Sequence, residues 1–157
     1  MRGTGWKAAV LAVAAMATMA LAGCRGDRPA TWIDPGMAVQ MAAAAGPDRG
    51  VEGVFALRVR SLASQHGRFY LNSEADYRDL RSLTIAIEPG VVPVLAARLE
   101  NRSLQQALKD QRILVRGEAR LQRIHFRIAN EPTGKYYWQV QVPVTDASQI
   151  LLPGEQG

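Results

Sequence analysis

Arginine is the residue type in this sequence that most clearly predicts binding chemistry. Seven arginines alternate with apolar residues in runs that have the period of a β-strand, so they should lie on the solvent side of those strands. A guanidinium donates to carboxylate and phosphate groups in a planar, bidentate way. If the strands are neighbours these side chains form one basic stripe, and otherwise they are a solvated face. The stripe would consist of Arg58, Arg60, Arg112, Arg116, Arg120, Arg123 and Arg127.

A polar loop from Ser73 to Asp79 is the second candidate for binding. It places Tyr77 and Arg78 among acidic side chains between two expected strands. Either the loop contacts a ligand, or it is a structural turn in which Asn72 and Asp76 satisfy backbone groups. In the second case Arg78 pairs locally and Tyr77 closes the end of the domain. The sequence leaves both interpretations open.

Residues that could carry catalysis or bind a metal ion are sparse. The two histidines, His66 and His125, lie in an expected loop and on an expected strand, without the spacing of metal ligands. No serine lies in a nucleophile-elbow motif, and no glycine-rich phosphate loop is present. We therefore expect no metal ion, no cofactor and no catalytic residues, and predict that the protein is not an enzyme.

The single cysteine follows an N-terminus with the pattern of an export signal. Two basic residues precede the apolar stretch Ala8 to Leu21, which is shorter than the ~20 apolar residues of a membrane-spanning helix. The stretch ends in Leu21-Ala22-Gly23-Cys24, which resembles the lipobox of bacterial lipoproteins. The resemblance implies removal of residues 1–23 and transfer of a diacylglyceryl group to the Cys24 thiol. A plain signal peptide with an accidental cysteine is the alternative.

The lipobox resemblance also implies a location. A mature lipoprotein carries at least two acyl chains, which anchor it stably to a bilayer. Arg25 follows the cysteine where inner-membrane lipoproteins have aspartate, so the resemblance implies the periplasmic face of the outer membrane. The expected partners are the membrane itself, through the N-terminal lipid, and an envelope protein or an anionic envelope polymer. Nucleic acid is scarce in that compartment.

Length and charge set the limits of the mature chain. A chain of 157 residues fits one domain. Of its 19 Lys and Arg residues two precede Cys24, whereas all 14 acidic residues follow it, so the mature part is only mildly basic. This balance does not by itself indicate a nucleic-acid-binding protein. A single cysteine excludes an intrachain disulfide, so packing must stabilise the domain.

The expected organisation has four parts. Residues 1–23 are the signal peptide, and residues 24–50 are the lipidated cysteine and a flexible linker rich in Pro, Gly and Ala, in which Met37 to Ala45 could form a short helix. Residues 51–152 are the folded domain. Residues 153–157 form a C-terminal tail.

Within the folded domain the apolar residues first recur with a period of two. They predict strands near 55–59, 68–72 and 83–87, a broken helical segment over 91–110 with Ser103 as a cap, and strands over 111–128 and 136–144. After residue 121 the apolar residues change from odd to even positions, which predicts a bulge near Gln122 and an inward position for Phe126. In the last strand Trp138 alternates in step with Val140 and Val142, so it is also expected to point inward.

The expected order is β-β-β-α-β-β, which predicts a mainly β fold with one helical segment. It is the order of the OB-fold, a five-stranded Greek-key barrel. An open antiparallel sheet with one packed helix is the alternative.

Four runs of sequence form a recognisable pattern: Phe69–Asn72, Asp76–Asp79, Ser82–Ile85 and Arg112–Gly117. The pattern resembles that of a group of OB-like domains in poorly characterised exported bacterial proteins. This resemblance implies the fold far better than the function. We therefore expect a non-catalytic binding module at the cell envelope, with a nucleic-acid-binding OB domain as the alternative.

Replacement of Cys24 by serine tests the lipoprotein hypothesis. The weaker serine hydroxyl does not accept the diacylglyceryl group in place of the thiol, so Cys24→Ser should abolish lipid labelling and release the protein from membranes. Metabolic labelling with a fatty acid and fractionation after a salt wash measure both effects. Retention of the variant in the washed membranes would show that the lipoprotein hypothesis is wrong.

Overall fold

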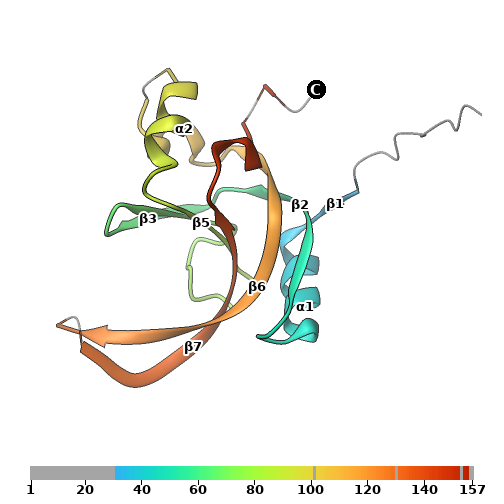
Figure 1. The fold of residues 1–157 in the computed structure, drawn as a ribbon, viewed down its shortest axis with the longest axis vertical. Coiled ribbons are helices and arrows are strands. Elements are labelled where there is room, and N and C mark those ends of the chain that lie inside the picture. The colour runs from blue at the N-terminus through green and yellow to red at the C-terminus, as the bar shows by residue number, and fades with distance from the viewer. Residues whose placement is uncertain (1–30, 101, 130, 153, 156–157) are drawn as a thin grey trace, which may run out of the picture.

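The computed structural model describes residues 31–100, 102–129, 131–152 and 154–155 (Figure 1). Cys24 and the expected signal peptide lie outside these residues. The strands are β1 (Trp32–Ile33), β2 (Gly50–Arg58), β3 (Ser61–Gln65), β4 (Arg68–Asn72), β5 (Leu83–Ile87), β6 (Arg112–Ile128), β7 (Glu131–Val144) and β8 (Ile150–Leu151). The helices are α1 (Pro35–Ala45), α2 (Val92–Arg98), α3 (Leu104–Leu108) and the short 3-10 turn η1 (Ala147–Gln149).

One curved sheet contains all the strands. Its hydrogen-bonded order is β1-β2-β6-β7-β5-β4-β3, and β8 pairs with β6 beyond the end of β7. The pairs β5–β7 and β1–β2 are parallel and the others antiparallel. The chain itself joins β2 to β3: the amide of Val59 donates to Gln111 beside β6, at 2.9 Å, and the amide of Arg60 donates to Asn72 of β4, at 2.8 Å. The sheet therefore curls into a small, partly open OB-like barrel.

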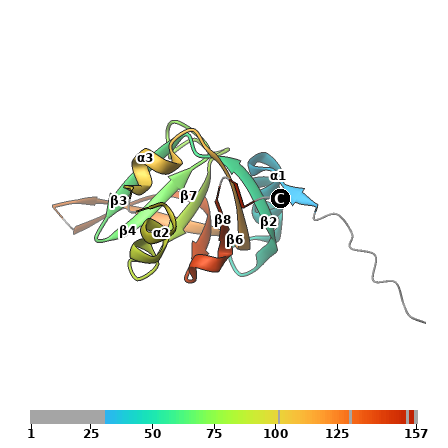
Figure 2. The same cartoon turned by 90° about the horizontal axis from the view of Figure 1, so that it is seen from above.

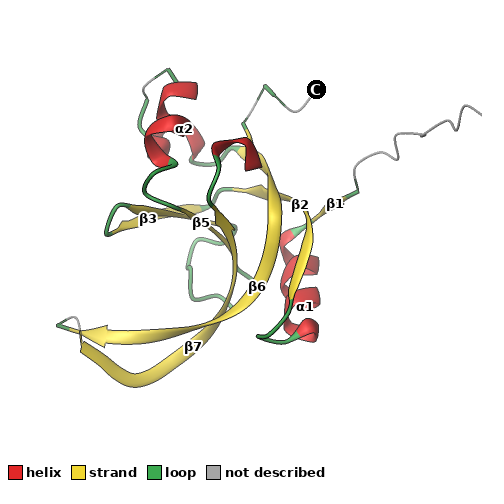
Figure 3. Cartoon of the chain, viewed as in Figure 1, coloured by secondary structure: helices red, strands yellow, loops and turns green. Residues whose placement is uncertain are grey.

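The predicted fold class is confirmed. Figure 3 shows a mainly β chain, and two short helices lie between β5 and β6, where one broken helical segment was predicted. The break lies where the sequence placed it, because the Ser103 hydroxyl accepts a hydrogen bond from the amide of Gln106 and caps α3.

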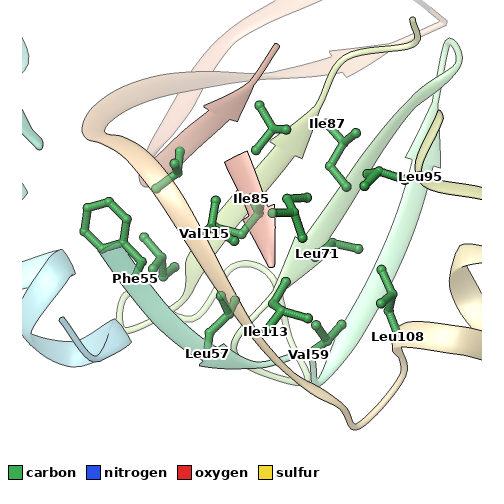
Figure 4. Packing of buried hydrophobic residues seen from close by; sticks show 14 of the residues in the cluster. Phe55, Leu57, Val59, Leu71, Ile85, Ile87, Leu95, Leu108, Ile113 and Val115 are labelled. Carbon is green, nitrogen blue, oxygen red and sulfur yellow. The ribbon is translucent and has the colours of Figure 1, made fainter. Parts of the chain in front are cut away.

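The core fills the inside of the barrel. Its members are mainly branched aliphatic side chains at alternate positions of the strands, with Phe55 near one end and Leu95 and Leu108 of the α2–α3 pair at the other (Figure 4). Gly117 of β6 faces this core, and a Cβ there would lie 2.8 Å from Val142 of β7. The absence of a side chain at residue 117 thus lets β6 and β7 approach closely at the bend of the barrel.

The expectation of a flexible linker over residues 24–50 is wrong from Trp32 onward, although the short helix expected within it is present. Trp32 and Ile33 form β1 along the edge of β2, and α1 follows with Asp34 as its N-cap. Ala38 and Ala42 of α1 are fully buried, and the helix contacts β2, β5, β6 and β7. The small alanines allow the helix to lie close to the open end of the barrel. The folded domain therefore includes β1 and α1, which lie before the predicted boundary at residue 51.

Strand details also differ from the sequence prediction. Residues 61–65 form a separate strand, β3, joined to β4 by a tight turn in which His66 and Gly67 both have positive φ. The register of β6 with β7 is regular through Gln122 and shifts between His125 and Arg127, so the predicted bulge lies four residues too early. β7 begins at Glu131, five residues before the predicted start of the last strand at residue 136.

The predicted inward position of two aromatic residues is wrong. Trp138 shares a strand face with the buried Val140 but is 39% exposed, and Phe126 is 41% exposed. Phe126 lies on the opposite strand face from Trp138. It shares a face with Ile124, two residues earlier, and Ile124 pairs with Tyr137 rather than with Trp138. Alternation in the sequence reports which residues share a face, whereas burial requires another layer of protein against that face.

Two isoleucine-to-alanine variants test the extent of the core. Ile85 of β5 is fully buried, so Ile85→Ala should lower the free energy of unfolding by about 2–5 kcal/mol. Ile128 at the end of β6 is 73% exposed, so Ile128→Ala should change it by less than about 0.5 kcal/mol. Denaturant unfolding measures both. Equal losses would contradict the boundary of the core described above.

Candidate binding surface on the β6–β7 arm

The hairpin of β6 and β7 extends beyond the barrel. β6 pairs with β2 only as far as Arg120, and β7 pairs with β5 only from Val140 onward. Residues 121–128 and 131–139 therefore have only each other as sheet neighbours, and we call this two-stranded extension the arm. Figure 1 shows it projecting from the barrel, and Figure 2 shows it on the side opposite β1.

One face of the arm carries a cluster of exposed aromatic and basic side chains. The Arg123 guanidinium carbon lies 5.3 Å from the centre of the Tyr136 ring, a cation–π distance. The Tyr136 ring is 6.0 Å from His125 and 6.0 Å from Trp138, the latter edge to face at 84°. Tyr136 is 49% exposed. We call these four residues the arm face; they are Arg123, His125, Tyr136 and Trp138.

The arm face continues the inner surface of the barrel into solvent. Arg123 pairs with Trp138, and two residues further along the strands Leu121 pairs with Val140, which is buried. Side chains two apart on a strand share a face, so the same row that packs in the core emerges beyond it. The arm face therefore lies on the strand face that points inward within the barrel, but in the arm no second layer of protein covers it.

The other face of the arm is braced by residues 73–82, the β4–β5 loop. Tyr137 lies 5.2 Å from Phe126 and 6.4 Å from Tyr77 of this loop, measured between ring centres. Its burial raises the pKa of the Tyr137 hydroxyl above the ordinary value. The side-chain amide of Gln139 donates to the backbone carbonyl of Tyr77 at 2.8 Å. A two-stranded ribbon is only marginally stable alone, so these contacts support the arm at its base.

The β4–β5 loop contains two ion pairs whose partners both lie in the loop. Arg78 pairs with Asp76 at 3.0 Å and Arg81 with Asp79 at 2.8 Å, and each arginine amide also donates to its aspartate. The hydrogen bond from the Arg81 side chain, with that from its amide, lowers the pKa of Asp79 to about 2. The expected local pairing of Arg78 is thus present, and Tyr77 contacts the arm.

Buried polar side chains fasten this loop to the sheet. The Thr84 hydroxyl donates to Asn72 at 2.8 Å, and Asn72 donates to the Ser61 hydroxyl, which donates to the Glu74 carbonyl. The Ser73 hydroxyl accepts from the Leu83 amide. Asn72 was expected to satisfy backbone groups and instead joins two side chains. These bonds satisfy groups that would otherwise be costly to bury.

The predicted arginine stripe is only partly assembled. Arg58 of β2 pairs directly with Arg112 of β6, and Arg116 lies further along the same outer face. Arg120 is on this face too but forms an ion pair with Glu118 at 2.7 Å. Glu52 lies opposite Glu118, so acidic side chains interrupt the row.

The remaining predicted residues lie apart from that face. Arg123 has the opposite strand parity and belongs to the arm face, while Arg127 lies near the end of the arm, opposite Pro132. Arg60 lies between β2 and β3, where its carbonyl accepts from the Lys109 ammonium. Thus Arg58 and Arg112 are neighbours, and the stripe is not a single row.

Within the described residues, no three His, Cys, Asp or Glu side chains gather in a way that could hold a metal ion. His66 lies in the β3–β4 turn, and His125 lies on the arm.

Sequence reasoning missed the arm, although a signal for it was present. The two runs that form β6 and β7 are longer than the other strands, at 17 and 14 residues. Strands in small barrels usually have fewer than ten residues. The length of these runs, with aromatic and basic residues concentrated near the turn that joins them, indicates a hairpin that extends beyond the rest of the sheet.

Comparison with known proteins identifies no family. No protein-family model matches the sequence, and no curated protein matches it significantly. A solved structure described as an aspartyl-tRNA synthetase from Leishmania major is similar at 13% identity with a TM-score of 0.43, over 83% of this chain. The chain spans 22% of that synthetase. A likeness of this size carries no argument about function.

None of the helices in the described part of the chain has the length and hydropathy of a membrane-spanning segment.

The Asp79–Arg81 pair yields a prediction about pH. Replacing Arg81 with glutamine removes the charged hydrogen bond that lowers the Asp79 pKa most, so this pKa should rise from about 2 toward its ordinary value. NMR titration of the carboxylates measures the shift. Because the folded-state pKa is depressed, the stabilising contribution is complete above the unfolded value and is lost as pH falls toward 2.

Arg78→Gln is the matched control, because it removes the equivalent partner of Asp76 in the same loop. It should raise the Asp76 pKa and leave Asp79 near its original value. An Asp79 pKa that does not move in Arg81→Gln would contradict the assigned pairing.

Proposed function

We propose that the protein is a membrane-anchored lipoprotein of the bacterial cell envelope whose OB-like domain is a non-catalytic binding module, and that it binds an anionic glycan on the arm face. The observation that carries the proposal is the exposed cluster of Arg123, His125, Tyr136 and Trp138. The lipid anchor rests on the lipobox-like sequence that ends in Cys24.

The chemistry of the arm face suits a chain of rings with acidic groups. Tyr and Trp offer flat apolar faces of large area together with a polar edge, and few torsions are lost when they bind. Arg123 offers a fixed fork of donors for a carboxylate or phosphate. Aromatic and arginine side chains are also the residue types that dominate binding energy in protein interfaces.

The position of the cluster supports binding rather than packing. Trp138 and Tyr136 are large side chains whose exposure is hard to explain by stability, since burying them would be favourable. Exposed apolar groups that are clustered, unlike those scattered singly, mark interaction sites. The bracing of the other face by Tyr77 and Tyr137 keeps the arm in one orientation, which reduces the entropy lost on binding.

Single-stranded nucleic acid is the second candidate ligand. Aromatic stacking beside a positive charge is also how OB-folds hold single strands, so the same cluster favours it chemically. The envelope location proposed from the lipobox favours the glycan instead. The two ligands differ in their dependence on salt, because each backbone phosphate contact contributes roughly −0.7 to the slope of log affinity against log salt.

Two variants with the same substitution test the site. Arg123→Gln removes a charge from the arm face, and Arg116→Gln removes one from the outer face of the same strand, seven residues away. Binding of the folded protein to soluble peptidoglycan chains and to lipopolysaccharide should weaken about tenfold in Arg123→Gln, equivalent to ~1.4 kcal/mol, and stay unchanged in Arg116→Gln. Isothermal calorimetry or fluorescence anisotropy measures this.

Further variants decide between the surfaces and ligands. Tyr136→Ala should weaken binding as Arg123→Gln does, while thermal unfolding shows whether each variant keeps its stability, since exposed charges add little to folding. Loss of binding on replacing Arg112, Arg116 and Arg120 together, with Arg123→Gln unaffected, would move the site to the outer face. Tighter binding of single-stranded DNA with a steep salt slope would favour the nucleic-acid alternative.

A further inference from the structure

The end of the domain opposite the arm also exposes large apolar side chains. Trp32 of β1 is 46% exposed, and on α1 Met37 and Met41 are 49% and 39% exposed. The two methionines are four residues apart and so lie on one side of the helix, away from the buried Ala38 and Ala42. Figures 1 and 2 both place β1 and α1 on the opposite side of the molecule from the end of the arm.

This end is also the one closest in sequence to the expected lipid anchor. Seven residues lie between Cys24 and Trp32, so eight Cα-to-Cα steps join them. At ~3.6 Å per residue, a fully extended chain of that length spans at most about 29 Å. A lipidated Cys24 therefore holds Trp32 within about 29 Å of the bilayer surface, whatever path the chain takes.

Basic side chains border the same apolar group. The Arg112 guanidinium carbon lies 5.1 Å from the centre of the Trp32 ring, and Arg58 is the direct strand partner of Arg112. Both arginines are exposed. Tryptophan concentrates at membrane–water interfaces, and each Lys or Arg close to an anionic membrane surface contributes about 1 kcal/mol of attraction.

We propose that the β1–α1 end of the domain rests on the membrane, with Trp32, Met37 and Met41 at the bilayer interface and Arg58 and Arg112 against anionic headgroups. This inference rests on the lipid anchor at Cys24 proposed above. It assigns the occupant of an otherwise uncovered apolar surface to the bilayer to which the chain is tethered.

The docked orientation has a consequence for the arm. Since the arm lies at the opposite end of the domain, docking through β1 and α1 directs the end of the arm away from the membrane. The domain then acts as a rigid spacer that presents its binding residues to the polymer beyond the headgroups.

The two tryptophans of the mature chain report on the two ends separately. Without residues 1–23, only Trp32 and Trp138 remain. The lipidated protein is reconstituted into vesicles that contain anionic phospholipid and brominated acyl chains, whose bromines quench tryptophan only at close contact. Trp138→Phe leaves Trp32 as the reporter, and Trp32→Phe leaves Trp138.

The expected result is asymmetric. Trp32 emission should shift to shorter wavelength and lose intensity, while Trp138 emission should be the same as in vesicles without bromine. Quenching of Trp138 with Trp32 unaffected would overturn the proposal and would show that the arm is the membrane-binding element. Absence of quenching at both residues would also overturn it, because the domain would then stand away from the bilayer.

A charge-matched pair tests the role of the headgroups. Arg58→Gln should reduce Trp32 quenching on anionic vesicles, whereas Lys135→Gln, which removes a charge from the exposed arm, should not. Equal effects would indicate a nonspecific loss of net charge and would count against the assigned contact.

Failure of the anchor is distinguishable from failure of docking. Mass spectrometry first shows whether Cys24 carries lipid. If it does not, the same thiol, the only one in the chain, is coupled to a maleimide lipid in the vesicles, which restores the tether. The quenching experiment then supports or overturns docking independently of natural acylation.

Discussion

The structure depends on how β6 shares its hydrogen bonds. Along its first part β6 bonds to β2 on one edge and to β8 on the other, and along its second part it bonds to β7 alone. The same strand is thus a wall of the barrel and one side of the arm. Because backbone groups must be paired, the arm can extend only as far as β7 accompanies it, and the two strands end together at residues 128 and 131.

The arm in turn depends on a loop that is distant in sequence. Residues 73–82 leave the sheet between β4 and β5, are tied back to it by Asn72 and Ser73, and place Tyr77 against Tyr137. Paired aspartates and arginines stiffen the loop without reaching the arm face. One face of the arm is therefore occupied by the protein itself, and the row that continues from the core stays open to a ligand.

The two exposed apolar groups of the domain differ in chemistry as well as in place. The arm face combines rings with a guanidinium and a histidine, which suits a polymer with flat units and acidic substituents. The β1–α1 end combines a tryptophan with flexible methionines and bordering arginines, which suits the mixed surface of a bilayer. A segment of seven residues, 25–31, joins the second group, and not the first, to the expected lipid.

Much of the fold could be predicted from the sequence because the positions of its strands and helices follow from the local spacing of apolar residues. Alternation identified β4, β5 and the barrel part of β6, and Ser103 identified the break between the helices. The order of these elements indicated the OB-like barrel, since few topologies connect them without crossing. The lipobox-like segment is likewise a purely sequential signal.

Tertiary structure alone decided which apolar residues are covered. Trp138 and Val140 share a strand face and look equivalent in the sequence, yet only Val140 lies where β5 continues the sheet and the core begins. Ala38 looks like part of a linker, yet it is fully buried because α1 closes the end of the barrel. Periodicity is a property of neighbouring residues, whereas burial and the grouping of Arg123, Tyr136 and Trp138 on the arm face depend on where distant strands end.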